Sequence, residues 1–215
     1  MKITGEEGYI PVSGVFEIHL FGPVDADPET FAKFEEACKQ CGRMTKTLKL
    51  SLHFETGNHF VPQSSTYISA PSVEKAREVS AELLKVFEAA NVPIIREKIE
   101  AIAHNKGVPE TDEEAAKFPE HYFEYHLRLN TEVCYDVSTG LSKMFGHKIP
   151  LSCNLYPPYQ CFLNARTYEM GSETSGRLVD YITMELEKRG IQVCKRISEF
   201  IVFDSYKNLD KGWLE

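Results

Sequence analysis

Apolar and polar residues alternate along several short segments, and between them lie stretches whose apolar residues recur every three or four positions. The first spacing is typical of strands with one buried face, and the second of helices with one buried stripe. Asp27 followed by Pro28 predicts the start of a helix. The first half then contains a strand at 15–22, a helix from Pro28, strands at 47–56 and 59–69, a helix opening at Pro71 and Ser72, and a strand starting near Ile94.

The second half of the chain gives the same order of predicted elements. The segment Phe16–Leu20 (FEIHL) recurs as Phe123–Leu127 (FEYHL), and residues 50–69 align without a gap to residues 151–170. Because repeats of this kind mark a duplicated unit, the chain is predicted to be a tandem duplication. The elements expected in the second half are a strand at 122–128, a helix at 131–145, strands at 149–156 and 160–169, a helix at 174–189 and a strand at 191–203.

Each half therefore reads as a βαββαβ unit, an order that resembles the ferredoxin-like fold. That resemblance implies an α+β protein with two antiparallel sheets, each covered by helices on one face and open on the other. The expected boundaries are a first repeat at 1–105, a linker at 106–120 and a second repeat with a C-terminal tail at 121–215. The linker region is polar and acidic, which favours a surface segment.

Side chains of a strand alternate between its two faces, so the apolar positions identify the face that lies under the helices. Phe16, Ile18 and Leu20 are expected in the core, which sends Glu17 and His19 to the open face. The residues expected to face the helices from the second strand are Leu50, Leu52 and Phe54, which leaves Ser51, His53 and Glu55 on the open face. The open faces are thus predicted to be polar, either solvated or packed against each other.

Glutamate and histidine recur on the open face of both halves, and they suggest a site between the two faces. A Glu–His pair can act as a general base with its orienting partner, and Arg166 can grip a carboxylate or a phosphate. The predicted catalytic residues are Glu17, His19, Glu124 and His126, and the predicted substrate-binding residues are His53, Tyr67, Asn164, Arg166 and Tyr168. The cofactor stays unknown. If a divalent metal is bound, its expected ligands are Glu17, His19, His53, Glu124 and His126.

Composition narrows the classes of partner. The formal net charge of −8 argues against a nucleic-acid surface, which needs clustered Lys and Arg. The sequence contains no apolar run long enough to span a membrane and no apolar N-terminal stretch typical of a signal peptide, so a cytoplasmic protein is expected. In that compartment the six cysteines are expected to be reduced.

Two classes of function are compatible with this sequence. The preferred one is a small-molecule enzyme or binding protein, with an anionic ligand as the interpretation of Arg166. The alternative is a non-catalytic module that uses the sheet faces or edges to bind a protein partner or a second copy of itself. An oligomer is compatible with either class. The sequence identifies neither the substrate nor the reaction.

Overall fold

The structure is a computed structural model, and it describes residues 10–42, 45–54, 57–130, 135–156 and 160–207. The strands are β1 (Gly14–Phe21), β2 (Thr45–Phe54), β3 (Gly57–Ala70), β4 (Arg96–Ile102), β5 (Tyr122–Leu129), β6 (Leu151–Asn154), β7 (Gln160–Tyr168) and β8 (Val193–Asp204). The helices are α1 (Pro28–Gln40), α2 (Val73–Ala89), α3 (Asp112–Ala115), α4 (Tyr135–Phe145) and α5 (Ser172–Lys188).

The eight strands of the described residues belong to one closed antiparallel barrel, in the order β1-β3-β2-β6-β7-β5-β8-β4. The predicted fold class, two separate sheets each with an open face, is therefore wrong. The cause is pairing at the edges: β2 pairs with β6, and β4 pairs with β8. We call these two junctions between the halves the seams of the barrel. They differ in length, because three residue pairs join β2 to β6 and five join β4 to β8. The polar face of each half becomes the lining of a single interior.

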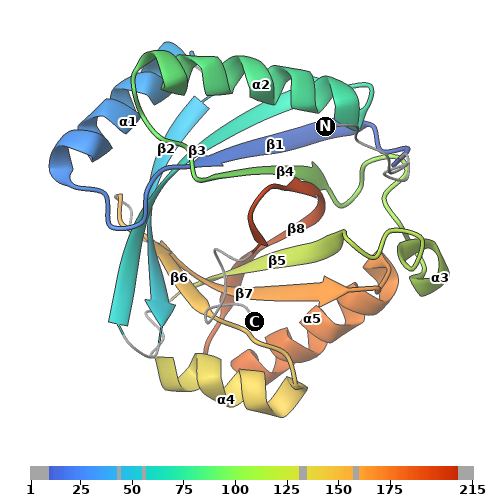
Figure 1. The fold of residues 1–215 in the computed structure, drawn as a ribbon. Coiled ribbons are helices and arrows are strands. Elements are labelled where there is room, and N and C mark those ends of the chain that lie inside the picture. The colour runs from blue at the N-terminus through green and yellow to red at the C-terminus, as the bar shows by residue number, and fades with distance from the viewer. Residues whose placement is uncertain (1–9, 43–44, 55–56, 131–134, 157–159, 208–215) are drawn as a thin grey trace.

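The helices lie outside the barrel. Figure 1 shows α1 and α2 on one side, α4 and α5 on the opposite side, and α3 beside the barrel. The apolar core lies between the helices and the outer face of the strands, where Ile18, Phe34 and Phe123 have no exposed surface. Among the described helices, none has the length and apolar character needed to cross a membrane.

Local signals place the helices as the sequence predicts. The Asp27 side chain accepts hydrogen bonds from the backbone N–H groups of Glu29 and Thr30, and Pro28 occupies the first turn of α1. The short helix α3 lies inside the predicted linker and starts with a capping box formed by Thr111 and Glu114. The helix expected at 131–145 is described from Tyr135, and residues 131–134 lie outside the described residues.

The predicted orientation of β2 is wrong. Leu50 and Leu52 line the barrel interior, and Ser51 is buried on the opposite face. Both faces of a barrel strand are buried, so apolar alternation alone does not say which face is inside. On β1 the prediction is correct: Ile18 lies in the outer core and His19 in the interior.

The two halves differ in register, although the strand order β4-β1-β3-β2 of the first half matches β8-β5-β7-β6 of the second. Glu17 pairs with Tyr67, whereas Glu124 pairs with Arg166 and Tyr168 pairs with Tyr122. Glu17 and Glu124 are aligned by the sequence repeat, and so are Tyr67 and Tyr168, yet only the first of the two glutamates pairs with the corresponding tyrosine. The tandem duplication remains a prediction.

A disulfide joins Cys153 on β6 to Cys161 on β7, which corrects the prediction that all six cysteines are reduced. The two residues face each other in the β6–β7 ladder, with Cα atoms 4.1 Å apart. Cys38, Cys41 and Cys194 are free thiols. Burial raises the pKa of Cys38 to about 11, which suits a core thiol rather than a reactive one.

Thiol titration of the denatured protein tests this disulfide. We expect two more thiols with reductant than without it, and no difference for a Cys153→Ser/Cys161→Ser double variant. Equal counts in the wild type would show that the bond does not form in the protein as purified.

Candidate functional site

The barrel interior is filled with ionisable side chains. Eight strands enclose a space just wide enough for side chains or one small ligand, so these groups are held close together. They come from five of the strands: Glu17 and His19 from β1, Arg96, Lys98 and Glu100 from β4, Glu124 and His126 from β5, Arg166 from β7, and Glu199 and Asp204 from β8.

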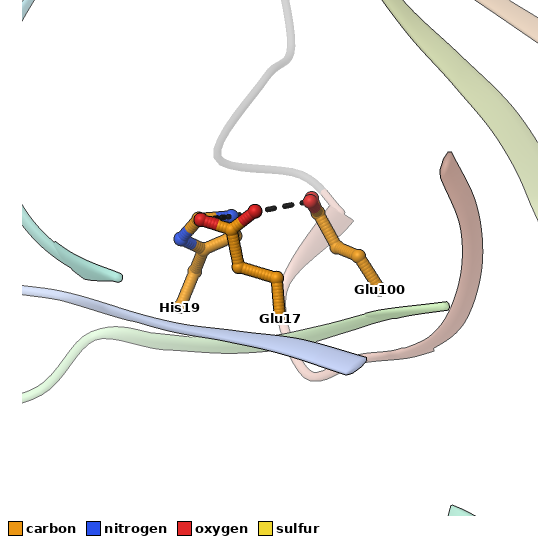
Figure 2. A group of neighbouring side chains, drawn as sticks. All are labelled: Glu17, His19 and Glu100. Carbon is orange, nitrogen blue, oxygen red and sulfur yellow. Dashed lines mark hydrogen bonds and ion pairs between the residues drawn. The ribbon is translucent and has the colours of Figure 1, made fainter. Parts of the chain in front are cut away.

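Glu17, His19 and Glu100 form the first cluster. Figure 2 shows the two side chains of β1 and the Glu100 side chain of β4 with their ends converging. His19 Nε2 lies 3.1 Å from Glu100 Oε2 and 3.6 Å from Glu17 Oε1. Burial lowers the pKa of His19, but the carboxylates of Glu100 and Glu17 outweigh it and raise the pKa to about 9. The imidazole is therefore an imidazolium at neutral pH when only these groups surround it.

Lys98 lies between two buried carboxylates. Its Nζ atom is 2.5 Å from Glu100 Oε1 and 2.7 Å from Glu124 Oε2. Arg166 Nη2 donates to the same Glu124 oxygen at 3.1 Å. Burial raises the pKa of Glu124, yet the positive charges of Lys98 and Arg166 dominate and hold it well below its ordinary value. This group is a carboxylate fixed between two cations.

His126 and Glu199 form a second cluster on the other side of Glu100. His126 Nε2 lies 3.4 Å from Glu199 Oε2, and its Nδ1 lies 2.6 Å from Asn164 Oδ1. Burial and the Glu100 carboxylate raise the pKa of Glu199 to about 8. Although burial lowers the pKa of His126, the hydrogen bond to Glu199 and the charge of Glu124 raise it to about 9.

Arg96 and Asp204 form a two-bonded pair at the edge of the interior. Arg96 Nε donates to Asp204 Oδ1 at 2.8 Å, and Nη2 donates to Oδ2 at 2.6 Å. The Tyr122 hydroxyl donates to Asp204 Oδ2 at 2.7 Å. Planar, two-bonded contacts of this kind are the strongest ion pairs in proteins, and this one ties β4 to β8.

A cavity of about 70 Å³ opens beside these groups. One wall is apolar and consists of Phe21, Leu50, Leu52 and Val61. The polar residues that line it are His19, Gln63, Arg96, Lys98, Glu100, Glu124, His126, Ser152, Asn164 and Arg166. The side chain of His126 keeps 24% of its surface exposed, against 8% for His19, so solvent reaches the site on the His126 side.

The structure brings most of the predicted site residues together in this interior: Glu17, His19, Glu124, His126, Asn164 and Arg166. Tyr67 lies opposite Glu17 and is 37% exposed, and burial with the Glu17 charge raises the pKa of its hydroxyl. Tyr168 packs against Tyr122 instead, with ring centroids 5.0 Å apart and ring planes tilted by 39°. His53 belongs to β2, and its side chain lies outside the described residues.

Sequence reasoning missed the contributions of β4 and β8. Lys98 and Glu100 alternate with Ile99 and Ala101, so the signal was present in the last strand of the first half. Glu199, in contrast, lies on a strand whose pairing with β4 contains a register shift, and simple alternation does not identify its partners. These residues complete both histidine clusters.

A larger groove of about 510 Å³ lies elsewhere, between α2, the segment at 117–121 and the end of β8. Its charged residues have both signs, among them Arg77, Glu120 and Lys207. Lys207 contacts the Glu120 carboxylate at 3.1 Å. Arg77 and Glu120 are exposed, whereas the charged groups of the interior cavity, such as Lys98 and Glu100, are buried, so the smaller interior cavity is the better candidate site.

No protein-family model and no curated protein matches this chain. Among solved structures, a heme-binding protein from Thermus thermophilus is 8% identical, with 91% of this chain and 95% of that chain covered and a TM-score of 0.28. A chlorite dismutase variant from Candidatus Nitrospira defluvii is 12% identical, with 97% and 100% covered and a TM-score of 0.29. A dye-decolorizing protein from V. cholerae is 7% identical, with 91% and 96% covered and a TM-score of 0.25. Likenesses this weak carry no argument about function.

Proposed function

We propose that the protein binds a small organic anion, of the short-chain carboxylate class, in the barrel cavity. The observation that carries this proposal is the two-sided lining, with a charged wall that contains Arg96, Lys98 and Arg166 beside the carboxylates of Glu100 and Glu124, and a wall of aliphatic and aromatic side chains. A molecule with one carboxylate and a short apolar chain matches both walls at once.

The charge of the lining favours an anion. Arg96, Lys98 and Arg166 are cations, and the raised pKa values of His19 and His126 add two more at neutral pH. Among the described residues, Glu100 and Glu124 are the carboxylates of the lining, and Glu17 and Asp204 lie against His19 and Arg96 beside it. Burial and the Glu100 carboxylate raise the pKa of Glu199 to about 8, so this group adds little negative charge at neutral pH. Five cations then face four carboxylates, and in a buried site of low dielectric this excess attracts a negative group more strongly than it would in water.

The size of the cavity limits the ligand. A water molecule needs about 10–15 Å³ of such space, so about 70 Å³ accommodates a molecule of several heavy atoms. The apolar wall of Leu50, Leu52 and Val61 offers contacts to a short hydrocarbon chain. Burying this many charges costs stability relative to an apolar core, which supports a binding role for them.

The alternative class, an interaction module that uses sheet faces or edges, has less support. Barrel closure pairs each described strand with two neighbours, so no strand edge of the described chain is offered to a partner. One face of the barrel wall points inward, and helices α1, α2, α4 and α5 cover much of the other face (Figure 1). Helix surfaces and exposed outer residues such as Phe60 on β3, which is 40% exposed, remain as places for an oligomer contact.

Calorimetry with a series from acetate to hexanoate tests the proposal, with the neutral amide of each acid as the comparison. We expect at least one acid to bind and its amide to bind at least about tenfold more weakly, because the amide cannot form charge-assisted hydrogen bonds. Arg166→Gln should weaken binding of the acid by about tenfold or more.

Arg196→Gln is the matched control, because Arg196 is an exposed arginine on β8 whose partner is Asp180. It should bind the acid as the wild type does. The proposal fails if no acid of the series gives binding heat or a thermal shift, or if acids and amides bind equally well. Circular dichroism of each variant confirms that the fold is intact.

A further inference from the structure

The cluster of Glu17, His19 and Glu100 has the dimensions of a metal site. Ligand atoms about 2.1 Å from a metal ion lie about 3.0–3.4 Å from one another at the usual bond angles. His19 Nε2 is 3.1 Å from Glu100 Oε2 and 3.6 Å from Glu17 Oε1, and the three ligand atoms fall within 4.8 Å of one another. The side chains thus converge already (Figure 2), and binding needs only a small adjustment.

The orientation of His19 is a second, independent observation. Its Nδ1 atom lies 3.1 Å from the backbone carbonyl oxygen of Ser64, which can only accept a hydrogen bond. Gln63 Nε2 lies 2.6 Å from the same Nδ1 atom, so two contacts hold this side of the ring while Nε2 points at the two carboxylates. Metal-ligating histidines are oriented in this way, with one ring nitrogen held by a hydrogen-bonding partner and the other directed at the ion.

The surrounding contacts also orient the two carboxylates of the cluster. The Ser65 hydroxyl donates to Glu17 Oε1 and orients this carboxylate. Lys98 occupies Glu100 Oε1, which leaves Oε2, the oxygen beside His19, for an ion. Glu100 also belongs to a second group with His126 and Glu199, whose ligand atoms lie within 4.8 Å of one another.

We infer that Glu17, His19 and Glu100 bind one divalent transition-metal ion inside the barrel. Two carboxylates and one imidazole suit Zn²⁺, Mn²⁺ or Fe²⁺, and three protein ligands leave coordination positions for water or a ligand. The ion takes the place of the Nε2 proton of His19, which passes to solvent. This inference rests on the geometry of the cluster and is independent of the proposed carboxylate binding.

Titration of chelator-treated, tag-free protein with Co²⁺ tests the site, since bound Co²⁺ absorbs visible light. We expect one equivalent to bind with a new absorption band and a higher melting temperature, because a ligand of the folded state stabilises it. Glu17→Gln and His19→Gln should each weaken Co²⁺ binding by about tenfold or more.

The control is Glu97→Gln, a half-buried glutamate of β4 paired with Leu20 and on the strand face opposite Glu100. It should bind Co²⁺ as the wild type does. Less than about 0.1 equivalent bound to the folded wild type, without a thermal shift, would overturn the inference. So would wild-type affinity in both cluster variants, with circular dichroism showing that they are folded. Carboxylate binding is measured separately on metal-free protein, so each proposal fails on its own result.

Discussion

Replacing Asp204 by Ala is expected to lower the free energy of unfolding by about 3–5 kcal/mol, the usual cost of removing one partner from a buried ion pair. The side chains of Arg96 and Asp204 are only 3% and 1% exposed. The change removes both hydrogen bonds of the Arg96 pair and the acceptor of the Tyr122 hydroxyl. Urea denaturation of the two proteins measures the difference.

Asp180→Ala is a matched control, because it removes the aspartate of an exposed Arg–Asp pair. Its partner is Arg196, and the two side chains are 67% and 32% exposed. Exposed pairs contribute little, so we expect a change of less than about 1 kcal/mol. If both variants lost the same free energy of unfolding, the buried pair would not stabilise the fold more than the exposed pair does.

The effect of Asp204 should depend on pH. Burial raises the pKa of Asp204, but the hydrogen bonds and charge of Arg96 outweigh it, so the folded-state pKa lies below the ordinary 3.8. A depressed pKa means that the stabilisation is complete above the unfolded-state value and is lost as pH falls through the folded-state value. The stability difference between wild type and Asp204→Asn should therefore be constant near neutrality and shrink below pH about 4. A difference that grew on acidification would contradict this assignment.

Ile18→Asp is expected to destabilise the protein by about 4 kcal/mol or more, which approaches the whole stability of many domains. Ile18 has no exposed surface, and its neighbours on the adjacent strands are Thr66 and Ile99. A carboxylate there is buried without a cation. Chemical denaturation measures the loss of stability. If Ile18→Asp does not fold, Ile18→Val still tests the burial of this side chain, and its expected cost is about 0.5–1.5 kcal/mol.

Val24→Asp provides the comparison, because Val24 is an aliphatic residue that is 39% exposed. We expect a change within about 0.5 kcal/mol. Equal losses at Val24 and Ile18 would show that the aspartate acts in some way other than through burial.

Local sequence signals predicted the elements but not the barrel. The Asp27 cap and the alternation around Ile18 depend on residues close in sequence, and both predictions were confirmed. Closure depends on β2 meeting β6, in which Leu52 pairs with Ser152, and no local pattern reports a contact between such distant residues. The face assigned to Leu50 was wrong for the same reason, since it assumed that the polar face was open.

Residues of the candidate site could be predicted from the sequence only where polar, ionisable side chains lay among the apolar residues of a strand. Glu17 and His19 interrupt an apolar strand and were noticed. Glu100 has the same spacing on β4, yet its importance follows from its position between both histidine clusters, which requires the three-dimensional structure. Lys98 was missed likewise, because one of its two carboxylate partners, Glu124, comes from another strand.

The unequal seams of the barrel also bear on its folding and its breathing motions. Both seams join residues about a hundred positions apart, so each half is expected to assemble its own strands before the ring closes. The β2–β6 seam has fewer ladder pairs, and its amides should exchange with deuterium sooner than those of β4–β8. Leu50, Leu52 and Ser152 belong to this seam and also line the cavity. Parting of β2 from β6 would therefore expose the charged interior to water without unfolding the rest of the chain.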